Sequence, residues 1–160
     1  NLWRTLLSNP QVLPAGLGAR DTLRLEIGLP LYGHELSVAR TPAGAGLDFA
    51  VALHKEFVGT PAVAAELAAG PRERLVGLLL TGRQSARAEQ PLVQQGAPVG
   101  AVTSGSFAPS VGAAIALAYI AAAQAAPATA VQIDTGRKLL DARVVPLPFY
   151  TRGTARSGPR

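Results

Sequence analysis

Two arginines at helical spacing are the residues of this chain best suited to hold a ligand. Arg20 and Arg24 lie four residues apart, so they share one face of a helix, and Arg20 follows the flexible run Gly16–Gly18. An arginine where a helix begins can reach a planar acceptor and donate two parallel hydrogen bonds to it. A carboxylate or the edge of a planar heterocycle would accept both bonds. The alternative for both side chains is a structural ion pair, with Glu26 or with another domain.

The other titratable residues give little sign of catalysis. Asp21 and Glu26 are five residues apart, about 140° around a helix, so they do not face one site, and Asp21 is expected to favour the helix dipole instead. His34 and His54 are the only histidines, and their spacing does not predict a metal site. His34 is expected to form a surface or interdomain hydrogen bond. The chain carries no nucleophile elbow and no nucleotide-binding glycine motif.

A polar run, Thr103–Ser110, reads Thr-Ser-Gly-Ser-Phe-Ala-Pro-Ser and follows an expected strand. Within it, residues 104–109 are expected to form a loop. The hydroxyl groups of that loop could satisfy free backbone groups within a turn. They could equally contact a substrate or another domain, and the sequence leaves both interpretations open.

Composition excludes several classes of function. Without cysteine among its 160 residues, the chain has no disulfide, thiolate metal site or cysteine nucleophile. The net charge of +5 is scattered and the aromatic residues are few, so no nucleic-acid surface is predicted, whereas mild basicity suits a polyanionic substrate. Neither a signal peptide nor a membrane span is predicted, and a cytoplasmic location is expected. Because the chain begins at Asn1 and lacks methionine, we expect a fragment or a processed piece.

The elements that would position Arg20 are short helices separated by glycine and proline. Helices are expected at residues 2–8, at 15–27 with Gly28 as the stop, and at 60–69 with Thr60 as the N-cap. Residues 47–53 alternate apolar and other side chains, which predicts a strand.

From residue 71 onward the pattern changes to short strands separated by glycine turns. Strands are expected at 75–80, 92–93, 97–103, 128–134 and 139–149, while residues 113–120 are ambiguous between helix and strand. This pattern predicts a small antiparallel β-barrel. The predicted fold class is therefore α+β, with an incomplete α+β domain at 1–70, a barrel domain at 71–150 and a disordered tail at 151–160.

Several segments resemble, in order, one enzyme family, the folate-dependent aminomethyltransferases or T proteins of the glycine cleavage system. Gly16–Leu36 is similar to the family's Gly-Leu-Gly-Ala-Arg-Asp-Thr-Leu-Arg-Leu-Glu-Ala-Gly motif and the Leu-Tyr-Gly that follows it. Gly100–Ser110 resembles Gly-x-Val-Thr-Ser-Gly-Thr-Phe-Ser-Pro-Thr. Shorter similarities lie at 56–59, 75–78, 115–120 and 147–150, so the resemblance covers residues 1–150 and favours a strand at 113–120. One departure is Ser37-Val38, where the family usually has an Asp-Glu pair.

The resemblance implies the end of a folate-binding α+β domain followed by the C-terminal barrel. It implies an enzyme that transfers the one-carbon unit from the aminomethyl-lipoyl arm of the H protein to tetrahydrofolate, giving methylenetetrahydrofolate and ammonia without a metal. Arg20 matches the family's folate-contacting arginine. The family's catalytic aspartate lies upstream of residue 1, so no catalytic residue is expected here and the chain alone is expected to be inactive. The alternatives are a folate domain of a dimethylglycine or sarcosine oxidoreductase and a non-catalytic folate-binding module.

Overall fold

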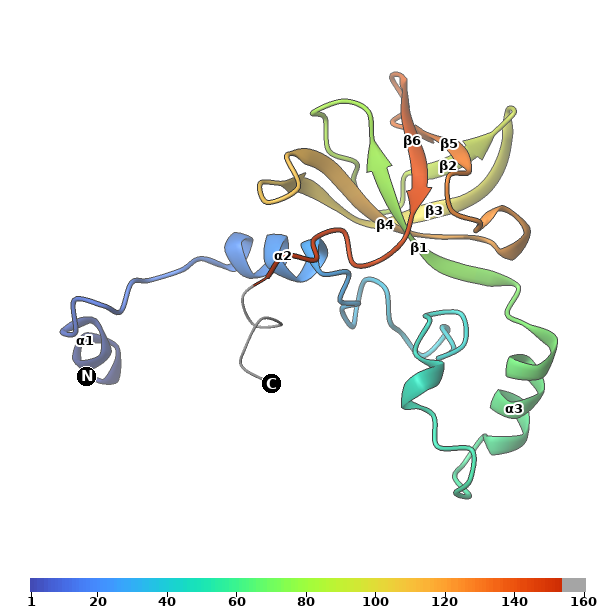
Figure 1. The fold of residues 1–160 in the computed structure, drawn as a ribbon, viewed down its shortest axis with the longest axis horizontal. Coiled ribbons are helices and arrows are strands. Elements are labelled where there is room, and N and C mark those ends of the chain that lie inside the picture. Colours follow the sequence, from blue (N-terminus) through green and yellow to red (C-terminus); the bar gives the residue numbers. More distant parts are fainter. Residues whose placement is uncertain (154–160) are drawn as a thin grey trace.

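A closed β-barrel with an extended N-terminal segment on one side makes up the computed structural model, which describes residues 1–153 (Figure 1). The barrel strands are antiparallel and follow the order β1-β4-β3-β2-β5-β6. They are β1 (Glu73–Leu80), β2 (Pro91–Gln94), β3 (Ala97–Ala108), β4 (Ala113–Ala121), β5 (Ala130–Asp134) and β6 (Leu139–Val145). The α+β class with a small antiparallel barrel is confirmed. The predicted tail at 151–160 lies outside the described residues from 154 onward.

Two apolar clusters explain the ambiguous sequence of β4. The larger one draws residues from all six strands and fills the barrel, where β4 contributes Ala114, Ala116, Ala118 and Ile120. The smaller one includes Ile115 and Leu117 on the opposite face of β4, with Leu25 of the second helix packed against them. Because both faces of β4 are buried, its residues are apolar throughout and the polar alternation of a half-exposed strand is absent.

Three helices precede the barrel, where the sequence predicted them: α1 (Leu2–Leu7), α2 (Leu17–Glu26) and α3 (Thr60–Ala69). α2 ends just before Gly28, as the sequence predicted, and Gly28 takes a φ of +69°. The N–H of Leu29 then donates to the carbonyl of Arg24 at 2.8 Å, and the N–H of Gly28 donates to that of Leu25 at 2.9 Å. This termination turns the chain sharply away from the helix.

The N-terminus of α3 differs from the prediction. Gly59 occupies the N-cap position, and Thr60 is the first helical residue. The Thr60 hydroxyl donates to the Phe57 carbonyl at 2.7 Å and accepts from the Phe57 N–H at 2.9 Å. The hydroxyl therefore closes the preceding turn and does not cap the helix.

The strand predicted at 47–53 is wrong. Residues Asp48–Ala50 form a single 3-10 turn, η1, and Phe49 is exposed. Apolar alternation indicates a strand only where another strand pairs with it and a core covers one face. Within residues 1–153 this segment has no pairing strand.

The loop predicted at 104–109 is also wrong, because β3 continues to Ala108 after a bulge between Val102 and Ser104. A bulge lets a strand carry polar side chains while it keeps its pairing further on.

At the other end of the barrel, β6 stops at Val145 and does not reach residue 149, since Pro146 and Pro148 lack the N–H that a ladder needs.

Candidate functional site

Arg20, the predicted ligand-binding residue, lies in the first turn of α2 and is exposed to solvent. Among residues 1–153, its guanidinium takes part in no hydrogen bond or ion pair. Free donors on a planar group are the property that a carboxylate or a heterocycle edge would use. Its role as a ligand-binding residue stays a prediction.

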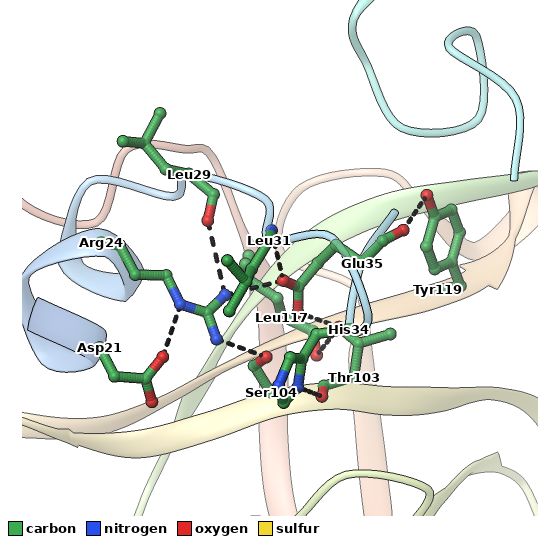
Figure 2. A network of polar contacts seen from close by, with 10 residues as sticks. All are labelled: Asp21, Arg24, Leu29, Leu31, His34, Glu35, Thr103, Ser104, Leu117 and Tyr119. Carbon is green, nitrogen blue, oxygen red and sulfur yellow. Dashed lines mark hydrogen bonds and ion pairs between the residues drawn. The ribbon is translucent and has the colours of Figure 1, made fainter. Parts of the chain in front are cut away.

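Arg24, one turn further along α2, is only 7% exposed and belongs to a polar network (Figure 2). Its Nε donates to Asp21 Oδ1 at 2.8 Å, which adds an ion pair within the helix. One terminal nitrogen donates to Glu35 Oε2 at 2.7 Å, and the other donates to Ser104 Oγ of β3 at 2.8 Å. The structural alternative therefore holds for Arg24, although its partners are Asp21 and Glu35 and not Glu26.

Glu35 is fully buried, and its carboxylate is surrounded by donors. Besides the bond from Arg24, Oε2 accepts from the backbone N–H of Leu31 at 3.0 Å. Oε1 accepts from the Thr103 hydroxyl at 2.7 Å, and the same hydroxyl lies 3.0 Å from the Leu117 carbonyl. Since a threonine hydroxyl has one proton, it serves one of these two acceptors at a time. A buried carboxylate needs this compensation because its desolvation is costly.

Tyr119 of β4 closes the network from the other side. Its hydroxyl donates to the backbone carbonyl of Glu35 at 3.0 Å, and the Arg40 guanidinium lies 3.9 Å from the centre of its ring. Arg40 also forms an ion pair with Glu73 at the start of β1. Burial raises the pKa of the Tyr119 phenol, while the Arg40 charge opposes that effect, so the hydroxyl stays protonated as a donor.

Two of the remaining titratable residues, His34 and Glu26, contact the barrel. His34 Nδ1 lies 3.4 Å from the Thr103 carbonyl of β3. Glu26 is buried and accepts from the N–H of Ser110 at 2.8 Å. Asp21 lies beyond the first turn of α2, and it pairs with Arg24 and not with the helix dipole as predicted. His54 stands apart from this group.

The network is structural in character, because Arg24 and Glu35 at its core are buried and face each other, and only Asp21 at its edge is partly exposed. Its geometry holds α2 against β3 and β4 and leaves Arg20 outside, one turn away. Within the described part of the chain, the acidic residues and histidines form no group of three that could hold a metal ion. No helix within residues 1–153 is both long enough and apolar enough to span a membrane.

Sequence reasoning missed Glu35 as the centre of this network. The signal that could have drawn attention to it is a carboxylate directly after the turn that Gly33 makes at a φ of +92°. Its partner Thr103 lies 68 residues further along the chain, and no local spacing connects the two.

Comparisons with known proteins agree on one family. A model described as the GCVT N-terminal domain matches residues 1–55, and one described as the glycine cleavage T-protein C-terminal barrel domain matches residues 73–151. Aminomethyltransferases from Moorella thermoacetica and Rubrobacter xylanophilus are 48% and 47% identical, over 94% and 95% of this chain and 42% and 40% of their own length. The crystal structure of glycine cleavage system aminomethyltransferase T from Bartonella henselae matches with a TM-score of 0.88 and 37% identity, covering 93% of this chain and 43% of that one. The chain thus spans about two fifths of these relatives.

Proposed function

Because the chain belongs to the glycine cleavage T-protein family, we propose that it forms the C-terminal part of a tetrahydrofolate-dependent aminomethyltransferase. In the proposed reaction, the aminomethyl group on the lipoyl arm of an H protein supplies a one-carbon unit to tetrahydrofolate. The products are methylenetetrahydrofolate, ammonia and the H protein with its lipoyl arm as the free dithiol. The relatives named aminomethyltransferase support this proposal, and the absence of cysteine fits a cytoplasmic enzyme.

The observation that carries the proposal is the contrast between two arginines on one helix. Arg24 is fully engaged and anchors α2, whereas the exposed Arg20 has all its donors available. A guanidinium held on a fixed helix can donate two parallel hydrogen bonds to the pterin edge or to a carboxylate of the folate. Arg20 is therefore the residue that we propose to bind folate.

The proposed role of this chain is to position a substrate rather than to transfer protons. The exposed part of α2 carries no carboxylate–histidine pair that could act as an acid and a base. We assign that work to an aspartate outside this chain, as the family resemblance implies. What α2 contributes is a fixed orientation of the acceptor, which lowers the entropic cost of reaching the transition state.

Replacing Arg20 by alanine in the complete enzyme tests this assignment. We expect the affinity for tetrahydrofolate to fall roughly tenfold to a hundredfold, the range for a lost charge-assisted hydrogen bond. Isothermal titration measures the affinity, and Arg4→Ala on α1, another exposed arginine, is the matched control. Equal affinities of Arg20→Ala and Arg4→Ala would rule out Arg20 as the folate contact.

The proposed partner is tested separately by product formation. The complete enzyme should form methylenetetrahydrofolate from aminomethyl-loaded H protein only when tetrahydrofolate is present. The 160-residue chain alone should form none. Product formation by the chain alone would contradict the assignment of the acid–base residues to another part of the enzyme.

A further inference from the structure

The barrel end that lies uppermost in Figure 1 carries a cavity of about 650 Å³ with no part in the folate proposal. It lies between the loop joining β1 to β2 and the hairpin turn joining β5 to β6, which both emerge at this end. The residues that line it are all polar or charged in type: Gln84, Arg87, Gln90, Thr135, Arg137 and Lys138. Cavities of a few hundred cubic ångströms are the usual size for small-molecule sites.

The lining itself carries three cations and no carboxylate. Arg87, Arg137 and Lys138 are exposed, and within residues 1–153 their charged groups form no ion pair. Three carboxylates lie next to the lining in the sequence, Glu89 in one loop and Asp134 and Asp141 on the adjoining strands, and none of them forms an ion pair with the three cations within residues 1–153. Asp134 Oδ1 accepts from the N–H of Gly136 at 2.7 Å, and Asp141 Oδ1 accepts from Gln132 at 2.8 Å. Three cations therefore converge on one cavity whose lining holds no carboxylate.

Both segments that carry these cations are held in shape by their own hydrogen bonds. In the hairpin turn, the Thr135 hydroxyl donates to the Lys138 carbonyl at 2.8 Å, and Gly136 takes a φ of +75°. In the other loop, the N–H of Arg87 donates to Gln90 Oε1 at 2.8 Å. This contact turns the oxygen of the Gln90 amide toward the backbone and leaves its NH₂ group as a further donor.

We propose that this cavity binds a compact oxyanion with two or more negative charges, of the phosphate or polycarboxylate class. Arginine forks suit planar carboxylates and phosphate oxygens, and three cations from two loops favour a multivalent anion over a single charge. The concave shape favours a small molecule over a flat acidic surface. The site is independent of Arg20, since it depends on the barrel loops alone.

Titration of the 160-residue chain tests the proposal with two probes, inorganic pyrophosphate and citrate, and with acetate as the monovalent comparison. We expect saturable binding of one pyrophosphate or citrate per chain, with acetate at least tenfold weaker. The tighter of the two probes identifies the phosphate or the carboxylate class. Amide chemical shifts should move at residues 84–90 and 135–138.

The double variant Arg87→Gln/Lys138→Gln should bind the preferred probe about tenfold more weakly. Arg4→Gln/Lys55→Gln removes the same two charges from exposed positions outside the barrel and should bind normally. Circular dichroism shows whether both variants keep the fold, and Arg137→Glu repeats the test by reversing a charge. Unsaturable binding, equal loss in the two double variants, or shifts confined to other residues would each overturn the proposal.

Discussion

At the scale of single residues, Arg24 and Glu35 depend on each other. Glu35 is fully buried, and Arg24 is the cation that compensates it, at 2.7 Å. Replacing Arg24 by methionine would leave a buried carboxylate without its charge partner. We expect a loss of about 3–5 kcal/mol in the free energy of unfolding, measured by urea denaturation. Arg20→Met, on the same helix but exposed, should change it by about 0.5 kcal/mol or less.

A double-mutant cycle separates this charge effect from lost packing. If the buried carboxylate is the cause, Arg24→Met/Glu35→Leu should be less destabilised than the sum of the two single variants. Additive losses would instead mean that the two side chains stabilise the junction separately, through contacts such as the bond from Arg24 to Ser104.

Tyr119 makes stability depend on pH in the alkaline range. Burial raises the pKa of its phenol above the ordinary 10.0, and the charge of Arg40 only partly offsets this. As pH rises, the phenol therefore loses its proton in the unfolded chain before it does so in the folded chain. The contribution of Tyr119 to stability is complete below pH 10 and is lost as pH rises through the folded-state pKa. Urea unfolding at neutral pH and at about pH 11, which lies above the ordinary tyrosine pKa, should show this decrease in the free energy of unfolding.

The matched variant is Tyr119→Phe, which removes the titrating group and the hydrogen bond to the Glu35 carbonyl. It should be less stable at neutral pH but should lose less on going to high pH. A parallel decline of both proteins with pH would assign the alkaline sensitivity to other residues.

At the scale of elements, the sequence predicted what local chemistry determines. Gly28 marked the end of α2, and a glycine turn was predicted between the strands at 92–93 and 97–103, where Gln95 and Gly96 both take positive φ. These features depend on backbone freedom at single positions, which residue type reveals.

Prediction failed where distant residues decide the structure. The alternation at 47–53 resembled a strand, but a strand needs a neighbour, and the local sequence contains no information about one. The polar run at 104–109 resembled a loop, but β4 pairs with it residue by residue and α2 gives Ser104 a partner. Glu35 was missed for a similar reason, because its partner Thr103 is distant in the sequence.

Close pairing of β3 with β4 also explains a glycine within a strand. A Cβ atom on Gly100 would lie 2.0 Å from the carbonyl oxygen of Tyr119, which is a backbone atom and cannot turn aside. Gly100→Ala should therefore separate the strands and destabilise the barrel by about 1–3 kcal/mol, as overpacking does elsewhere. Thermal unfolding measures this effect.

Gly18→Ala in α2 is the matched control, since its Cβ would meet no atom within 4 Å. Alanine is the better helix former, so this variant should be stabilised by about 0.5–1 kcal/mol. A Gly100→Ala protein as stable as the parent would mean that the strands can move apart at little cost.

At the scale of the whole molecule, the barrel and the N-terminal segment differ in how much they bury. The barrel has a continuous apolar interior, whereas the first part of the chain leaves large apolar side chains in water. Trp3 is 62% exposed and Leu17 is 86% exposed, and Leu13 and Phe49 are exposed as well. Many large apolar side chains left in water along one segment are consistent with a surface that another part of an assembly covers. In the enzyme proposed above, additional chain would cover it.

Hydrogen exchange tests this difference in stability along the chain. α1 has six residues, none of them buried, and helices this short are marginal in water, so its amides should exchange nearly as fast as in an unfolded peptide. The amides of β4, paired on both sides and buried on both faces, should exchange only through global unfolding. In the complete enzyme the α1 amides should slow markedly while those of β4 change little. Protection of α1 equal to that of β4 in the 160-residue chain would show that the N-terminal segment is stable without any cover.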